Sequence, residues 1–183
     1  MARIIGYRRF GGVEVLEEGS VSLPAPGEGQ VLVTVRAAGI NPVDYKLFGG
    51  LTRPLEVLRT IVHPGRWFAC GADRPLHGVG QDFAGVVAAV GPGVTNVAVG
   101  DEVIGLLRAA PWQVREYGSL ATQLVISADN VVSKPASMSF DVAGGLGVAA
   151  QTAMGAMRSV KAEAGDVIVV AAAAGGVGGL VTQ

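Results

Sequence analysis

The glycine-rich stretch near the C-terminus contains the residue types that most directly suggest chemistry. Four β-branched residues at positions 167–170 form a short apolar run, typical of a strand buried on both faces. Gly175, Gly176, Gly178 and Gly179 follow at once. A glycine turn between a strand and a helix lets bare backbone amides approach a pyrophosphate. The window 173–178 (AAGGVG) fits the pattern G-x-G-x-x-G with alanine in its first position, which favours a dinucleotide site but is also compatible with an ordinary turn in an α/β core.

Candidate metal ligands are few. Cys70 is the one cysteine, and it lies seven residues from each of the two histidines, His63 and His77. Three such side chains could bind a metal, but no compact pair of ligands anchors them, so a loop with incidental His and Cys is the simpler interpretation. A single cysteine also excludes an intrachain disulfide framework and a multi-cysteine zinc site.

Composition excludes several classes of function. Half of the residues are hydrophobic and 16% are charged, against about 25% in a typical globular protein. The net charge is −1 and the basic residues are scattered, so neither nucleic acid nor an anionic membrane is an expected partner. The N-terminus has no apolar signal-peptide core, and the longest uncharged apolar run is short and broken by glycines. We therefore expect a cytoplasmic protein.

The first 134 residues have the pattern of short strands separated by turns. Such strands at intervals of about 8 to 12 residues indicate a barrel or a sandwich. A helical turn is expected at 43–48 and a short amphipathic helix at 54–62. The expected strands are 2–10, 13–17, 30–37, 83–90, 102–107, 119–126 and 131–132.

The pattern changes to helical at Pro135. Ser139 can cap a helix, and apolar residues then recur at helical spacing to about Val160, with Met154 expected in the core. A strand at 167–171 and the glycine turn follow. The expected domains are therefore 1–134 and 135–183. The second is expected to be incomplete, because the acidic residue that should follow about 20 positions after the turn has no place before Gln183.

Four stretches in this order resemble the medium-chain dehydrogenase/reductase superfamily, and within it the zinc-free quinone oxidoreductases. They are 38–44 (AGINPVD), 80–103 (beginning GQDFAGVV), 151–153 (QTA) and 172–178 (AAAGGVG). The resemblance implies a mainly β N-terminal GroES-like barrel at 1–134, followed by the start of an α/β Rossmann domain that binds a nicotinamide cofactor. It does not cover 51–78, which is longer than the usual connection and reads as an insertion.

The resemblance also implies a reaction. Hydride would pass from NADPH, with NADH not excluded, to a quinone or an activated enone. Zinc-dependent relatives place a cysteine where Asn41 stands and a histidine where Gln81 stands, and an amide supplies neither kind of ligand. No metal is therefore expected. A homodimer is expected when the enzyme is full length.

Roles of individual residues follow from the same resemblance. Asn41 would face the nicotinamide or the substrate carbonyl, and is otherwise a turn residue before Pro42. Asp44 contacts the cofactor or starts a helix, and Tyr45 donates to a substrate oxygen or is a packed aromatic. Thr152 lies near the nicotinamide or packs a helix, and Asp82 ties its loop together. The residues expected near the pyrophosphate are Ala174, Gly175, Gly176, Val177 and Gly178.

Two alternative functions remain open, beside one hypothesis about the insertion. An enoyl reductase acting on acyl thioesters would use related chemistry, with Tyr45 as proton donor. A truncated chain that cannot bind cofactor would be a non-catalytic binding module. The insertion, with Trp67 and Phe68, is interpreted as a cover on the substrate side of the cleft.

Overall fold

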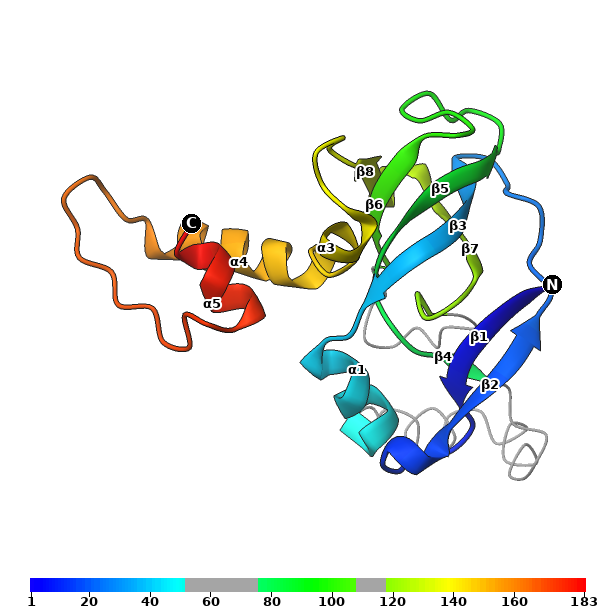
Figure 1. Cartoon of the computed structure of the whole chain (residues 1–183), viewed down its shortest axis with the longest axis horizontal. Coiled ribbons are helices and arrows are strands. Elements are labelled where there is room, and N and C mark those ends of the chain that lie inside the picture. The colour runs from blue at the N-terminus through cyan, green and yellow to red at the C-terminus, as the bar shows by residue number, and fades with distance from the viewer. Residues whose placement is uncertain (52–75, 108–117) are drawn as a thin grey trace, which may run out of the picture.

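Antiparallel strands form the larger part of the computed structural model, which describes residues 1–51, 76–107 and 118–183 (Figure 1). Figure 1 shows the strands gathered in one body, with helices α4 and α5 extending to one side of it. The expected mainly β architecture is confirmed. The predicted helix at 54–62, most of the insertion, and residues His63, Trp67, Phe68 and Cys70 lie outside the described residues.

A five-stranded sheet forms the main core. Its strands are ordered β7-β3-β5-β6-β8, and every neighbouring pair is antiparallel. Side chains alternate between a buried and a more exposed face along the first half of β3, where Val31 and Val33 are fully buried, whereas successive residues are buried in β5 and β7. The bounds are β3 Gln30–Gly39, β5 Asp82–Val90, β6 Glu102–Leu106, β7 Gln123–Ser127 and β8 Val131–Ser133, with a short 3-10 turn, η4, at Ala128–Asn130 before β8.

A second, three-stranded sheet has the order β2-β1-β4. It consists of β1 (Ala2–Tyr7), β2 (Leu16–Val21) and β4 (His77–Gly78). The Ile5 amide donates to the Leu120 carbonyl at 2.8 Å, which joins β1 to the segment before β7. Residues 119–122 therefore bridge the two sheets instead of extending β7, as the predicted strand at 119–126 required.

The predicted strand at 13–17 is wrong in its first half. Val13–Val15 forms a 3-10 turn, η1, and β2 begins at Leu16. The Gly12 amide donates to the Glu14 carboxylate at 2.8 Å, and the Val15 amide donates to the Gly12 carbonyl at 3.2 Å. These local bonds compete with strand pairing, so the chain turns before it pairs with β1.

Two helices replace the single helix expected from Ser139 to Val160. They are α3 (Phe140–Gly144) and α4 (Gly147–Val160). The Ser139 hydroxyl caps α3 as predicted, accepting the Val142 amide at 3.3 Å. The end of α3 packs closely on the sheet, because a Cβ on Gly144 would lie 2.9 Å from the backbone of Ala37 in β3. Helix α3 thus lies directly against the sheet, and α4 starts in a new direction.

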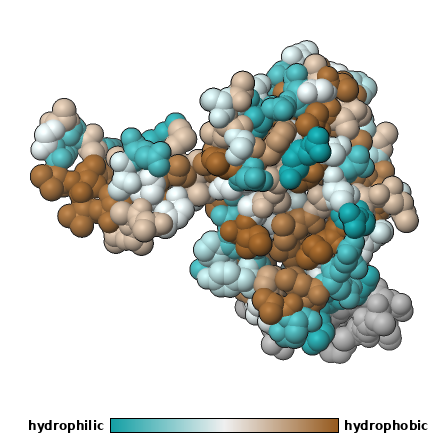
Figure 2. Space-filling view, in the orientation of Figure 1, coloured by the Kyte–Doolittle hydropathy of each residue, from teal (hydrophilic) through white to brown (hydrophobic). Residues whose placement is uncertain are grey.

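Two further expectations for this part of the chain are wrong. Val167 and Val169 are 92% and 90% exposed, and residues 167–171 form no strand. No strand of the described residues lies beside them, so their backbone groups have no ladder partner. Figure 2 shows the resulting apolar surface at the end of the molecule away from the sheets. Met154, expected in the core, is 54% exposed on α4.

A buried lysine closes the junction between β8 and α3. The Lys134 side chain is 4% exposed, and its Nζ lies 2.9 Å from a Glu102 carboxylate oxygen. Nζ also donates to the carbonyls of Pro135 and Met138, and it lies 5.0 Å from the centre of the Phe140 ring. One ammonium group therefore holds β6 and the turn that leads into α3.

Replacing Lys134 by methionine is expected to lower the free energy of unfolding by about 2 kcal/mol. The variant keeps the apolar stem but leaves two carbonyls and Glu102 without their shared donor. Urea unfolding checks this, with Lys46→Met as the control because Lys46 is exposed on α1 (Pro42–Lys46). Equal stability of the two variants would contradict the prediction.

Candidate functional site

Asn41 stands where β3 ends and α1 begins. Pro42 occupies the first helical position, where the missing amide costs no hydrogen bond. Asp44 is 2% exposed, and its Oδ2 accepts the Asn41 backbone amide at 2.7 Å, so the two residues form a capping box. This is the geometry of the helix-start interpretation of Asp44. A direct contact of Asp44 with a cofactor stays a prediction.

Asp82 lies at the centre of the site. It is the first residue of β5, it pairs with Gly39 of β3 and Leu106 of β6, and it is fully buried. One carboxylate oxygen, Oδ2, accepts Nδ2 of Asn41 at 2.9 Å. The other, Oδ1, accepts the backbone amide of Val148 at 2.8 Å. Because Val148 is the second residue of α4, a single carboxylate joins the start of α1 to the start of α4.

Glycines allow this close approach. A Cβ on Gly147 would lie 2.7 Å from Asp82 Oδ1, and a Cβ on Gly39 would lie 2.8 Å from the Gly144 carbonyl oxygen. Both distances are shorter than real side chains tolerate. Glycine inside a helix is ordinarily destabilising, and here Gly147 makes room for the carboxylate that accepts the Val148 amide at the start of α4.

Burial raises the pKa of Asp82, and the hydrogen bonds from the Asn41 side chain and the Val148 amide partly oppose that rise. The folded protein therefore holds the Asp82 proton at pH values where the unfolded chain has already released it. Stability gained from the protonated carboxyl is present below the ordinary pKa and is lost as pH rises through the raised pKa.

The stability difference between wild type and Asp82→Asn is expected to depend on pH with a definite sign. As pH rises from about 4 through the raised pKa of Asp82, the free energy of unfolding of wild type should fall relative to that of Asp82→Asn. Above that pKa the difference between the two proteins should no longer change with pH. Urea unfolding of both proteins at a series of pH values measures this difference. A change in favour of wild type over the same range would show that the two hydrogen bonds outweigh burial.

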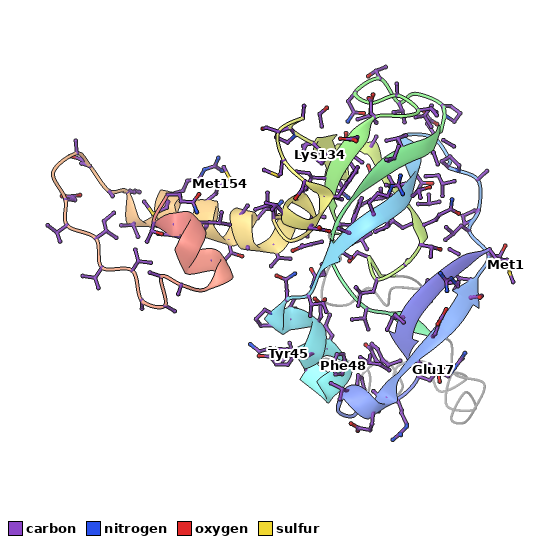
Figure 3. All side chains as sticks on the ribbon, viewed as in Figure 1. Met1, Glu17, Tyr45, Phe48, Lys134 and Met154 are labelled. Atoms are coloured by element: carbon purple, nitrogen blue, oxygen red, sulfur yellow. The ribbon has the colours of Figure 1, made fainter. Side chains whose placement is uncertain are left out.

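The other two side chains named from the sequence are both exposed. Tyr45 is 53% exposed and points away from the sheets in Figure 3, so its interpretation as a packed aromatic is wrong. Thr152 is exposed on α4, one turn after Val148, and its hydroxyl donates to the Val148 carbonyl at 2.7 Å. It therefore does not serve as a buried packing residue. Contacts of either residue with substrate or cofactor stay predictions.

The glycine turn packs against α4. Ala172 has a positive φ of 55°, and its carbonyl accepts the Gly175 amide at 2.9 Å. Helix α5 (Gly176–Val181) follows, as the sequence predicts. A Cβ on Gly176 would touch that of Ala149 at 3.8 Å, and Ala149 follows Val148. The turn thus lies against the same first turns of α4 that Asp82 caps, although no hydrogen bond links it to Asn41.

Asn41 and Asp82 could be found from sequence only through the family resemblance, whereas the amide of Val148 carries no sequence signal at all.

Within the described ranges, no group of three or more His, Cys, Asp or Glu side chains lies close enough together to hold a metal. His77 belongs to β4, with its ring 5.5 Å from that of Tyr7. In the same part of the chain, no helix has both the length and the apolar character needed to cross a bilayer.

Comparison with known proteins identifies the family. Residues 27–136 match the alcohol dehydrogenase GroES-like domain. The chain belongs to this family. The GroES-like domain thus includes β3, α1 and Asp82, so the predicted resemblance is confirmed for the part of the chain that carries the site.

Individual relatives agree with this assignment. The 2-methylene-furan-3-one reductase of Solanum lycopersicum is 37% identical over 180 residues, covering 97% of this chain and 42% of the relative. The chloroplastic NADPH-dependent alkenal/one oxidoreductase of Arabidopsis thaliana is 35% identical with the same coverage. The quinone oxidoreductase structure from Coxiella burnetii superposes with a TM-score of 0.79 at 30% identity, over 98% of this chain and 51% of that one. The GroES-like chain thus spans about half the length of the relatives that it matches.

Proposed function

We propose that this chain acts in hydride transfer from NADPH to a quinone or an activated enone, without a metal. In this proposal residues 1–134 form the substrate side of the site, and residues 135–183 begin the nicotinamide-binding domain. The observation that carries the proposal is the position of Asn41 at the end of β3, where its side-chain amide donates to Asp82. The same Asp82 carboxylate accepts the Val148 amide of α4, the helix against which the glycine turn packs.

In this proposal the glycine turn receives the pyrophosphate of the nicotinamide cofactor. A side chain at Gly178 would collide with the carbonyl of Ala172, so the backbone there is bare. Ala174, Gly175 and Gly176 are exposed and able to approach a pyrophosphate. The bound cofactor would supply the hydride. The choice of NADPH is supported by the name of the Arabidopsis thaliana relative, and NADH is tested beside it.

Amides stand at the two positions where zinc-dependent relatives place a cysteine and a histidine, and the neighbouring Asp82 carboxylate is already occupied by hydrogen bonds from Asn41 and Val148. Asn41 and Gln81 supply amides, and zinc sites are built from thiolate, imidazole and carboxylate ligands. The donor set therefore suits hydrogen bonding to a carbonyl oxygen. Beside Asn41, Ile40 and Tyr45 are 75% and 53% exposed and offer an apolar surface to a quinone ring or an enone.

The proposal is tested by following NADPH absorbance with benzoquinone, an alkyl vinyl ketone and a crotonyl thioester in the presence of a chelator. We expect turnover with the first two acceptors, unaffected by the chelator and slower with NADH. Asn41→Ala should lower kcat/KM by about tenfold or more, since it removes a fixed hydrogen bond to the reacting partners. Asn130→Ala, in the turn before β8, is the matched control and should behave as wild type.

The alternatives give different results in the same assay. Preference for the thioester would support an enoyl reductase. Failure to bind NADPH in a fluorescence titration would support a non-catalytic module. Loss of activity with the chelator would contradict the proposal of chemistry without a metal.

A further inference from the structure

We propose that Asp82 is a positioning residue that determines which end of the Asn41 amide faces the reacting partners. The orientation of the amide is a property of the described residues, whereas its consequence for hydride transfer rests on the proposed function. Two carboxylates hold Asn41: Asp82 accepts a hydrogen bond from its side chain, and Asp44 accepts one from its backbone amide.

An ionised carboxylate accepts hydrogen bonds and donates none. Asp82 Oδ2 lies 2.9 Å from Nδ2 of Asn41, so the amide must present its nitrogen to β5. On its other side the Asn41 side chain faces the backbone amide of Asp44 in the capping box, a group that only donates and that bonds to the Asn41 backbone carbonyl at 2.9 Å. Rotating the amide by half a turn would set its oxygen against the Asp82 oxygen and its nitrogen toward this donor. The Asp82 carboxylate therefore selects one orientation, and the Asp44 amide is compatible with it.

This orientation leaves one hydrogen of Nδ2 available. The first is donated to Asp82, and Asn41 is half-buried, so the second can reach a bound partner. Asn41 therefore offers a donor, which fits the carbonyl oxygen of a quinone, an enone or a nicotinamide carboxamide. An acceptor at residue 82 is what keeps that donor in place.

The same carboxylate fixes α4. Asp82 Oδ1 accepts the Val148 amide at 2.8 Å, and Gly147 leaves no side chain in the way. Helix α4 carries Thr152 and supports Gly176 through Ala149. Asn41 and the helix beneath the glycine turn therefore share one anchor, and a change at residue 82 reaches both sides of the site.

Stability does not explain why a charged residue is used here. Burial raises the pKa of Asp82 despite its two hydrogen bonds, which means that the ionised carboxylate is less favourable in the folded protein than in the unfolded chain. A neutral residue of the same shape should fold at least as well. A charge that disfavours folding, yet fixes the amide beside it, is the property expected of a positioning residue.

The test is Asp82→Asn, which keeps the shape and removes the charge. If the new carbonyl keeps the Val148 amide, the new NH₂ group points at Nδ2 of Asn41, and the Asn41 amide must rotate or lose its partner. We expect the midpoint of urea unfolding at neutral pH to stay the same or rise. The side-chain NH₂ signals of Asn41 should shift and lose protection from hydrogen exchange in NMR spectra, while the Val148 amide stays protected.

A double variant separates positioning from simple pairing. Asn41→Asp with Asp82→Asn restores one donor and one acceptor, so its stability should match wild type. It places no donor toward the substrate, so kcat/KM for benzoquinone should remain reduced by about tenfold or more in both the single and the double variant. Recovery of kcat/KM in the double variant would show that only the pairing matters, and would overturn the proposal.

The NMR measurement does not depend on turnover. If wild type oxidises no NADPH, the proposed function fails, while the effect of Asp82→Asn on the Asn41 signals still decides the orientation. Unchanged Asn41 signals in Asp82→Asn would overturn the positioning role even in an active enzyme. A large loss of stability in Asp82→Asn would also overturn it, since the residue would then be needed for folding.

Discussion

Alanine in place of Gly105 is expected to lower the free energy of unfolding by about 3 kcal/mol. Gly105 of β6 stands directly opposite Phe83 of β5, and a Cβ there would lie within 2.8 Å of three atoms of the Phe83 ring. The ring is fully buried in the main core with Val31, Val33, Val87 and Leu124, so any shift of the ring must displace buried neighbours. Close-packed interiors transmit such a collision to their neighbours.

Urea unfolding measures the effect, and Gly155→Ala is the control. Gly155 lies inside α4, and a Cβ there meets nothing within 4 Å. Alanine at this position should raise stability by about 0.5 to 1 kcal/mol, because it reduces the freedom of the unfolded chain and favours the helix. If Gly105→Ala unfolds at the same urea concentration as wild type, the Phe83 ring does not occupy the space over Gly105, and the prediction is wrong.

The strands around Phe83 could be predicted from sequence because their local pattern and their tertiary surroundings agree. Val31 and Val33 lie two residues apart, and the structure buries both on the inner face of β3. The run at 102–107 alternates in the same way in β6, whereas the small-residue run at 83–90 begins in β5 with residues that are buried on both faces. In each case a neighbouring strand forms hydrogen bonds with the backbone N–H and C=O groups that are buried together with the apolar side chains.

Residues 167–170 show why the same reasoning can fail. Their β-branched run has the composition of a buried strand, but a strand also needs a partner for its backbone groups, and the described residues supply none. Composition shows that a segment is able to form a strand, but the segment forms one only where a neighbouring strand pairs with it. The division into α3 and α4 was likewise not indicated by the helical spacing, and at this division Gly144 packs against β3.

The site was only partly accessible from sequence for a related reason. Asn41 and Gln81 were named because they stand where related enzymes hold zinc, and Asp82 had no role beyond its own loop. Its partner Val148 lies 66 residues further along the chain and contributes only a backbone amide. A backbone donor has no residue type, so no motif could have indicated this link.

Gly178→Ala is expected to weaken NADPH binding by about 30-fold, which corresponds to about 2 kcal/mol. A Cβ at Gly178 would overlap the carbonyl oxygen of Ala172 and lie 2.8 Å from its carbon and 2.9 Å from Cα of Ala173. All three are backbone atoms, so no side chain can move aside. The turn must open, and the hydrogen bond from the Gly175 amide to the Ala172 carbonyl, now 2.9 Å, must lengthen.

Gly179→Ala is the matched control, because a Cβ there meets only the Ala173 carbonyl oxygen at 3.5 Å, an ordinary contact. Fluorescence titration with NADPH compares the two variants, and hydrogen exchange at the Gly175 amide reports on the turn itself. Gly178→Ala should bind weakly and exchange fast, and Gly179→Ala should match wild type in both. If exchange rises in Gly178→Ala while the affinity stays unchanged, the turn has opened without harm to the cofactor, and the phosphates must bind elsewhere. Equal exchange in the two variants would show instead that the turn tolerates a methyl group where the structure leaves no space for one.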